Sequence, residues 1–148
     1  MGRELRRRSV SAIRSGVPRL ETIKGISRPF GIAAGQVAVW VGSNTDSTVT
    51  RIEPDTRRNI AEIMSGASRP TRAASSASPT GAGFVWALNR IASEVVRIDP
   101  RTNDVVARIP LGPGVEPRTL HVAGDAVWLS VGTPGFDARR AGRRSESG

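Results

Sequence analysis

The 148-residue sequence contains no cysteine and a single histidine. Without cysteine, the chain can form neither a disulfide framework nor a thiolate metal site, and one histidine excludes a His-rich metal site. Tyrosine is absent as well, and the aromatic residues are three tryptophans and three phenylalanines. No apolar run approaches the roughly 20 residues that a membrane-spanning helix needs. We therefore expect no metal, no other cofactor and no membrane partner.

Acidic residues are in deficit: 13 stand against 22 lysines and arginines, which gives a formal net charge of +9. Residues 1–19 carry six arginines against one glutamate, and residues 136–148 carry four arginines against two acidic residues. Residues 20–135 hold 12 basic and 10 acidic residues and are nearly balanced. The sequence therefore predicts disordered basic tails at 1–19 and 136–148. No apolar stretch of ~7–15 residues follows the first arginines, so we expect no signal peptide and a soluble protein whose location is cytoplasmic or unknown.

One stretch of the sequence occurs twice and begins a third time. Ala38–Thr56 is repeated as Phe84–Thr102, and Asp125–Ser130 starts a further copy. One tryptophan stands at the same place in each copy. Equivalent residues of the first two copies stand 46 positions apart, and Trp128 falls 42 positions after Trp86. The equivalent pairs are Trp40 and Trp86, Arg51 and Arg97, and Pro54 and Pro100. A period in the forties with several short strands per unit is typical of a β-propeller blade.

Each unit is expected to hold four short antiparallel strands, because apolar and β-branched runs alternate with turn residues. The units cover about residues 27–64, 68–109 and 115–131, the last of them incomplete. Ile23 matches the end of a unit, which predicts an isolated strand over Leu20–Ile23. The predicted fold class is therefore all-β, a partial propeller of about two and a half blades within residues 20–135. The recurring arginine and its acidic neighbour are expected to stay solvated or to pair weakly.

Given these residues, the chain resembles the YVTN-type β-propeller repeat proteins and, close to them, the streptogramin (virginiamycin B) lyase-like propellers. The resemblance is carried by Val-Trp-Val at Trp40, by Val-x-Arg-Ile-Asp/Glu-Pro ending at Pro54 and Pro100, and by the third Ala-Val-Trp-Leu. It covers about residues 20–131 and implies blades arranged in a ring around a channel. Such repeats serve surface proteins, sensor modules and a few enzymes, so the resemblance is specific for architecture and not for activity.

We expect a non-catalytic repeat module that binds a protein or a small molecule, or serves as a scaffold. The resemblance implies an alternative, a streptogramin B lyase-like, metal-dependent C–O lyase, whose family uses histidine and acidic residues over the channel. His121 does not map onto that catalytic motif, and its apolar neighbours indicate a half-buried strand residue. A triad of Ser130, His121 and Asp125 lacks the Gly-x-Ser-x-Gly elbow. No catalytic residue is therefore assigned.

Three charged residues share one position of the repeat. Arg28 and Arg69 each precede the proline that opens a unit, and Glu116 takes this place in the third unit. If the first strands line the channel, these residues lie at one rim and form an anion- or carboxylate-binding site. The alternative is that they are solvated charges at strand starts.

The basic tails raise a second alternative, nucleic-acid binding, because mobile arginines suffice to bind phosphate. The aromatic residues, however, are not interleaved with the arginine runs. Base stacking is therefore not indicated, and nucleic acid is not the expected partner.

A partial propeller exposes sheet edges, which is an aggregation hazard unless the edges are covered. Blades of this length normally occur four to eight at a time. We therefore expect one of two situations. Either two or three copies form a homo-oligomer that closes the ring, with Leu20–Ile23 completing a neighbour's partial blade, or the chain is a fragment of a longer propeller.

Overall fold

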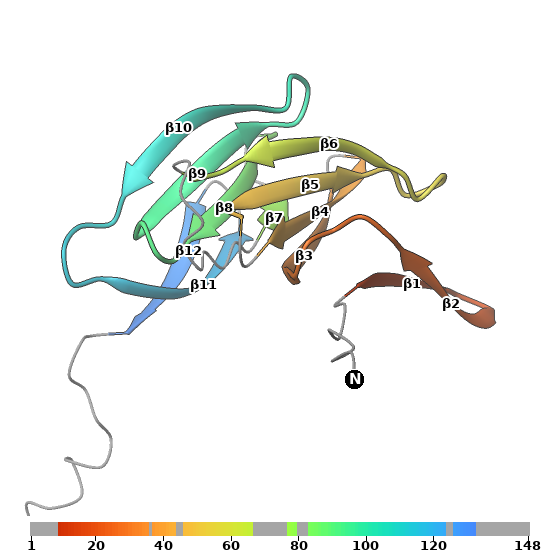
Figure 1. Cartoon of the computed structure of the whole chain (residues 1–148). Coiled ribbons are helices and arrows are strands. Elements are labelled where there is room, and N and C mark those ends of the chain that lie inside the picture. Colours follow the sequence, from red (N-terminus) through yellow and green to blue (C-terminus); the bar gives the residue numbers. More distant parts are fainter. Residues whose placement is uncertain are drawn as a thin grey trace, which may run out of the picture.

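The computed structural model describes residues 9–35, 37–43, 46–66, 77–79, 83–123 and 126–132. Within these ranges every regular element is a β-strand, and twelve strands form four antiparallel sheets (Figure 1). The same residues contain no helix that is long and apolar enough to span a bilayer. The predicted all-β fold class is confirmed.

Two sheets are complete four-stranded units, each with its strands in sequence order. The first contains β3 (Pro29–Gly35), β4 (Ala38–Ser43), β5 (Thr48–Ile52) and β6 (Asn59–Met64). The second contains β7 (Ala77–Pro79), β8 (Val85–Asn89), β9 (Glu94–Asp99) and β10 (Asp104–Pro110). A sequential antiparallel sheet of four short strands is the unit of a propeller, and we call these two sheets the first blade and the second blade.

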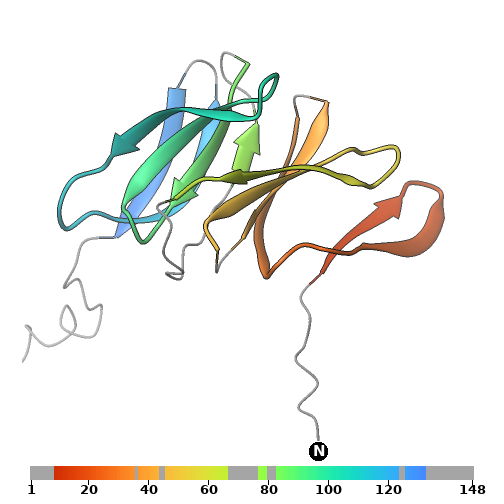
Figure 2. The same ribbon diagram turned by 45° about the horizontal axis from the view of Figure 1, so that its top comes forward.

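A two-stranded sheet lies at each end of the pair of blades (Figure 2). The N-terminal hairpin, which flanks the first blade, consists of β1 (Val10–Arg14) and β2 (Val17–Ile23). The C-terminal hairpin, which flanks the second blade, consists of β11 (Glu116–Ala123) and β12 (Ala126–Gly132). The described residues thus form an array of two complete blades between two half-blades.

The N-terminal hairpin corrects the predicted boundary of the basic tail. The sequence predicts a tail over residues 1–19 and one strand over Leu20–Ile23, but β1 and part of β2 precede Leu20. The boundary at residue 20 is therefore wrong. Residues 1–8 and the tail predicted at 136–148 lie outside the described residues.

Burial explains why this basic segment forms a hairpin. Gly16, between β1 and β2, has a φ of 89°, which glycine adopts without steric cost and which allows a tight turn. Val10 and Ile23 lie opposite each other and are buried against Ile52 of the first blade. The apolar contact with the blade stabilises the hairpin, although the sequence around it is rich in arginine.

Pairing registers identify which strands of a blade each hairpin represents. The corresponding pairs of the third and fourth strands are Val49 with Ile63, Val95 with Ile109, and Val10 with Ile23. The N-terminal hairpin therefore corresponds to the third and fourth strands of a blade.

The C-terminal hairpin corresponds to the first and second strands. His121 lies opposite Trp128 in this hairpin, just as Ala33 lies opposite Trp40 in the first blade. The first strands of successive units, β3, β7 and β11, contact one another along the array. Units that repeat in sequence thus also repeat the register with which their strands pair.

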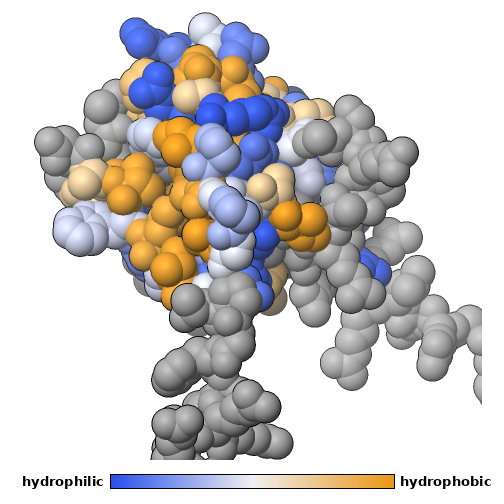
Figure 3. Space-filling model, turned by 90° about the vertical axis from the view of Figure 1, so that its left-hand side faces the viewer, coloured by the Kyte–Doolittle hydropathy of each residue, from blue (hydrophilic) through white to orange (hydrophobic). Residues whose placement is uncertain are grey.

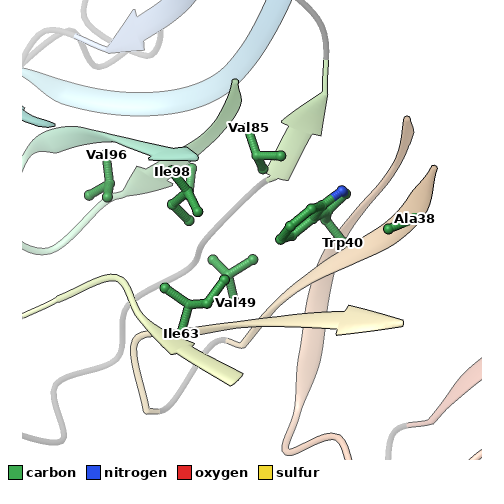
Figure 4. Close-up of a cluster of buried hydrophobic side chains, with 8 residues drawn as sticks. Ala38, Trp40, Val49, Ile63, Val85, Val96 and Ile98 are labelled. Carbon is green, nitrogen blue, oxygen red and sulfur yellow. The ribbon is translucent and has the colours of Figure 1, made fainter. Parts of the chain in front are cut away.

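Apolar side chains fill three interfaces between successive sheets. At the middle interface, Trp40 and Val49 of the first blade face Val85 and Ile98 of the second (Figure 4). Trp40 is fully buried, and its Nε1 donates a hydrogen bond to the carbonyl oxygen of Gly35 at 3.1 Å. Burying a side chain of this size contributes about 4–6 kcal/mol. The flanking interfaces contain Val10, Ile23, Val41 and Ile52 on one side, and Leu88, Val95, Leu120 and Leu129 on the other.

The turn between β3 and β4 contains a strained residue. Val37 has a φ of 57° and is 93% exposed. A β-branched residue is strained in this left-handed region, whereas glycine is not. Replacing Val37 by glycine is therefore expected to raise the free energy of unfolding by about 0.5–1 kcal/mol, after the greater freedom of the unfolded chain is subtracted.

Urea unfolding measures this effect, with Val106→Gly as the control. Val106 is also exposed, but its φ is negative, so glycine is expected to lower the free energy of unfolding by about 0.5–1 kcal/mol there. A loss of stability in both variants would contradict the strain at Val37.

Candidate functional site

Two of the three predicted rim residues lie within the described part of the chain. Arg28 precedes β3 and Glu116 begins β11, so each stands at the start of a first strand. Both are exposed, and Glu116 forms an ion pair with Arg118 at 3.7 Å. Arg69 lies outside the described residues. Because an exposed ion pair contributes less than about 1 kcal/mol, this pair does not define a site, and the anion-binding rim stays a prediction.

The repeat arginine has a different role from the one expected. Nη1 of Arg51 donates hydrogen bonds to the carbonyl oxygen of Pro100 at 2.6 Å and to Oδ1 of Asn103 at 2.9 Å. Its guanidinium also lies 5.2 Å from the centroid of the Trp40 ring. An arginine of the first blade thus enters the turn between the third and fourth strands of the second blade. The expectation that it stays solvated or pairs weakly is wrong for Arg51, and we call this contact the arginine joint.

Where the N-terminal hairpin meets the first blade, the arginine joint is missing. Ala12 lies opposite Glu21, at the register position that Arg51 occupies in β5. Arg57, in the turn of the first blade, forms an ion pair with Glu21 instead. At this interface the acceptor is on the hairpin and the arginine is in the turn of the next blade, which is the reverse of the arginine joint.

A pocket of about 440 Å³ lies at the place of the missing arginine side chain. Pro54 and Arg57 line it, and they are the counterparts of the two residues that Arg51 contacts in the second blade. The acidic residues Glu53 and Asp55 line it as well. Its apolar lining is formed by Ala12, Ile13, Ile23, Val39 and Ile52.

The charges of the pocket favour a cation. Arg57 is neutralised by its ion pair with Glu21, so the carboxylates of Glu53 and Asp55 leave an excess of negative charge. Oε2 of Glu53 also accepts a hydrogen bond from the hydroxyl of Thr56 at 2.6 Å, which fixes the orientation of this carboxylate. A pocket with apolar walls and acidic residues suits a cationic group on a short apolar stem.

The residues that the sequence associates with catalysis lie elsewhere. His121 is exposed on β11, which corrects its expected half-buried position. The hydroxyl of Ser130 is hydrogen-bonded to that of Thr119 at 2.6 Å across the C-terminal hairpin, and Asp125 lies outside the described residues. Among the residues that the structure describes, no group of three or more His, Cys, Asp or Glu side chains is placed to hold a metal ion.

The pocket was not predicted, although the repeat contains its signal. Val49–Ile52 and Val95–Ile98 share the pattern Val-x-Arg-Ile. Val10–Ile13 reads Val-Ser-Ala-Ile, the same pattern with alanine in place of arginine. Aligning the basic N-terminal segment with the repeat identifies both β1 and the missing arginine.

Two complete four-stranded blades between two half-blades define a partial β-propeller. The virginiamycin B lyase from Staphylococcus aureus has this fold, with a TM-score of 0.68 and 17% identity over 82% of this chain and 41% of that chain. A streptogramin B lyase matches with a TM-score of 0.67 and 20% identity, over 84% of this chain and 42% of that chain. The glutaminyl cyclase of Myxococcus xanthus matches with a TM-score of 0.54 and 17% identity, over 77% and 55%.

The chain spans about two fifths of the length of the two lyases. At these identities the similarity shows the fold alone, and at that level it confirms the predicted resemblance to YVTN-like and streptogramin lyase-like propellers. No protein-family model and no curated protein sequence matches the chain.

Proposed function

We propose that the chain is a non-catalytic β-propeller repeat module that binds a guanidinium or primary ammonium group of a partner. The proposed site is the pocket between the N-terminal hairpin and the first blade. The observation that carries the proposal is the arginine joint, in which Arg51 places a guanidinium at the corresponding position of the next interface. Ala12 leaves this position open to a cation from outside the chain. The partner is therefore a protein that presents an arginine or lysine side chain, or a small cationic molecule.

The arginine joint also indicates how the cation binds. The carbonyl oxygen of Pro100 accepts a hydrogen bond from Arg51, and Pro54 stands at the equivalent place in the pocket. Hydrogen bonds from a charged donor contribute about 1.5–3 kcal/mol when both groups are shielded from water. Asp55 adds a carboxylate where the second blade has Arg101, whereas Glu53 corresponds to Asp99 of the second blade. Guanidinium is favoured over ammonium, because its planar donors bind several acceptors at once.

Ethylguanidinium is expected to bind with a Kd on the order of 1 mM, the range reached by a fragment of this size. Changes in amide chemical shifts around Glu53 and Asp55 during an NMR titration report this binding. N-ethylurea, which has nearly the same shape but no charge, is the matched control and is expected to leave the shifts unchanged. Equal binding of the two compounds would contradict a cation site.

The substitution Ala12→Arg tests whether the pocket is the vacant position of the arginine joint. It is expected to fill the pocket with the chain's own guanidinium, to abolish ethylguanidinium binding and to raise the free energy of unfolding by about 1 kcal/mol. Thr22→Arg adds the same charge at an exposed position of β2 and is expected to do neither. Undiminished ethylguanidinium binding in the Ala12→Arg variant would exclude this pocket as the site.

The two alternatives from the sequence have weaker support. A streptogramin B lyase-like activity rests on the fold that the chain shares with such lyases and on the exposed side chain of His121. Nucleic-acid binding rests on the arginines of the predicted tails, of which residues 1–8 and 136–148 lie outside the described residues. The arginine joint and its vacant counterpart favour the cation-binding module over both.

A further inference from the structure

The two hairpins are complementary halves of one blade. The C-terminal hairpin has the register of the first and second strands, and the N-terminal hairpin has that of the third and fourth. They lie at opposite ends of the array, with the two complete blades between them (Figures 1 and 2). Within one chain, therefore, they cannot join into one sheet.

Each hairpin has a strand edge that has no partner in the described part of the chain. β12 pairs only with β11, whereas its counterparts β4 and β8 are paired on both edges. β1 pairs only with β2, whereas its counterparts β5 and β9 are paired on both edges. An unpaired edge is a template for another strand. The edge of β12 lacks a third strand of a blade, and the edge of β1 lacks a second strand.

Apolar side chains at these two edges are exposed, although their repeat counterparts are buried or, at Trp86, partly buried. Trp128 of β12 is 65% exposed, whereas Trp40 is fully buried. Ile13 of β1 is 72% exposed, whereas Ile52 and Ile98 are exposed to only 1% and 0%. Apolar surface is visible on the side of the molecule where the C-terminal hairpin lies (Figure 3). Both positions lack the cover that a complete blade supplies.

The first blade shows the same deficiency. Ile32 of β3 is 61% exposed, whereas Leu120, its counterpart in β11, is 4% exposed. Leu120 packs against Leu88 and Val95 of the preceding blade. Ile32 lacks such a neighbour because the N-terminal hairpin contains no first or second strand.

Arg97 adds a polar group without a partner at the other end of the array. The Nε atoms of Arg97 and of its counterpart Arg51 are both buried without an acceptor, but Nη1 of Arg51 donates two hydrogen bonds, whereas the side chain of Arg97 has no hydrogen bond or ion pair with another described residue. Its guanidinium lies over the Phe84 ring, 4.4 Å from the centroid. An arginine joint at this end needs a turn between a third and a fourth strand, and such a turn is present at Ser15 in the N-terminal hairpin.

We propose that a second copy of this chain docks its N-terminal hairpin onto the C-terminal hairpin of the first, so that β1 pairs antiparallel with β12 and the four strands form one composite blade. The registers of the two complete blades set the pairing: Trp128 lies opposite Ala12 of the second copy, and Val127 lies opposite Ile13. In this arrangement Trp128 faces the inner strands of the second copy's first blade, at Ile32. Arg97 reaches the β1–β2 turn of the second copy. The interface continues the one between the complete blades.

The number of copies follows from the number of blades. The described residues of each chain supply two complete blades and two halves, which together make three. Closed propellers have four to eight blades. One chain is therefore too small for a ring and three chains are too large, whereas two chains give six blades. The assembly is a closed dimer with two identical head-to-tail junctions.

Light scattering coupled to size exclusion tests the dimer. The full chain is expected at about 31 kDa, twice the 15.7 kDa of one chain. Trp128→Lys and Ile13→Lys are each expected to weaken association at least 30-fold, as loss of an interface hot spot does, while circular dichroism remains that of a β-rich fold. Ile60→Lys, at a 50%-exposed position of β6 outside the proposed junction, is the matched control and is expected to remain a dimer. A monomer at 100 μM, a larger assembly, or equal dissociation of the control would overturn the proposal.

A disulfide tests the register and does not depend on destabilising the protein. The chain has no cysteine, so introduced pairs report their own contacts. Ile13→Cys combined with Val127→Cys is expected to yield a covalent dimer on mild oxidation, because facing residues of antiparallel strands are close enough for a disulfide. Ile13→Cys combined with Val131→Cys is four residues out of register and is expected to yield none. Similar cross-linking of both variants would refute the composite blade.

Discussion

Replacing Trp40 by alanine is expected to lower the free energy of unfolding by about 3–5 kcal/mol. The side chain is fully buried between the two complete blades, where it packs with Val85 and Ile98. Its removal leaves a cavity at an interface that is already packed, and it also removes the hydrogen bond to Gly35. Domains of this size are stable by only about 5–15 kcal/mol, so the variant is close to unfolding. Urea unfolding followed by circular dichroism measures the loss.

Trp40→Phe separates packing from hydrogen bonding at this position. Phenylalanine keeps most of the buried ring and loses the indole N–H, so the expected loss is about 1–2 kcal/mol. If Trp40→Ala costs no more than Trp40→Phe, the ring does not fill the interface in the way that the structure describes.

Replacing Arg51 by leucine is expected to lower the free energy of unfolding by about 2–4 kcal/mol. Arg51 donates to Pro100 and Asn103 of the second blade, and hydrogen bonds of a charged donor contribute about 1.5–3 kcal/mol. Its guanidinium also lies over Trp40, a contact that adds about 0.5–1 kcal/mol or more when shielded from water. Leucine retains apolar contact but leaves both acceptors without a donor. Chemical unfolding again gives the difference.

Arg101→Leu is the matched control for the arginine joint. Arg101 is an arginine in the turn of the second blade, with an 85%-exposed side chain and an ion pair to Asp99 at 3.5 Å. Such a surface pair contributes little, so the expected change is within about 0.5 kcal/mol. Equal losses in the Arg51 and Arg101 variants would show that the joint does not couple the blades.

The architecture was predictable because each blade packs against its neighbours through the same residue types at the same repeat positions. A tryptophan at one position and the Val-x-Arg-Ile pattern fix a second and a third strand in each unit. The proline and asparagine turns separate the third strand from the fourth. The second, third and fourth strands of the complete blades could therefore be derived from the repeat, whereas β7 (Ala77–Pro79) lies in a stretch where the spacing between proline and tryptophan departs from that of the other units.

The candidate site could not be derived from spacing, because it depends on contacts between units. Arg51 and Pro100 are 49 positions apart, and nothing in the sequence of one unit indicates that its arginine enters the turn of the next. The pocket follows only when the joint is known and Ala12 is aligned with Arg51. The alignment of Val10–Ile13 with Val49–Ile52 was not made from the sequence, because the arginines of residues 1–19 are typical of a disordered tail.

The arginine joint and the apolar interfaces connect each blade only to its immediate neighbours. A gene that encodes such a chain can therefore lengthen by duplicating one unit in frame, since the new copy meets the same surfaces on both sides. One added unit would give four blades per chain, the number with which a single molecule can close a propeller by itself. If the proposed dimer forms, one in-frame duplication does the same work as a second copy of the chain, because either change supplies the blades that close the ring.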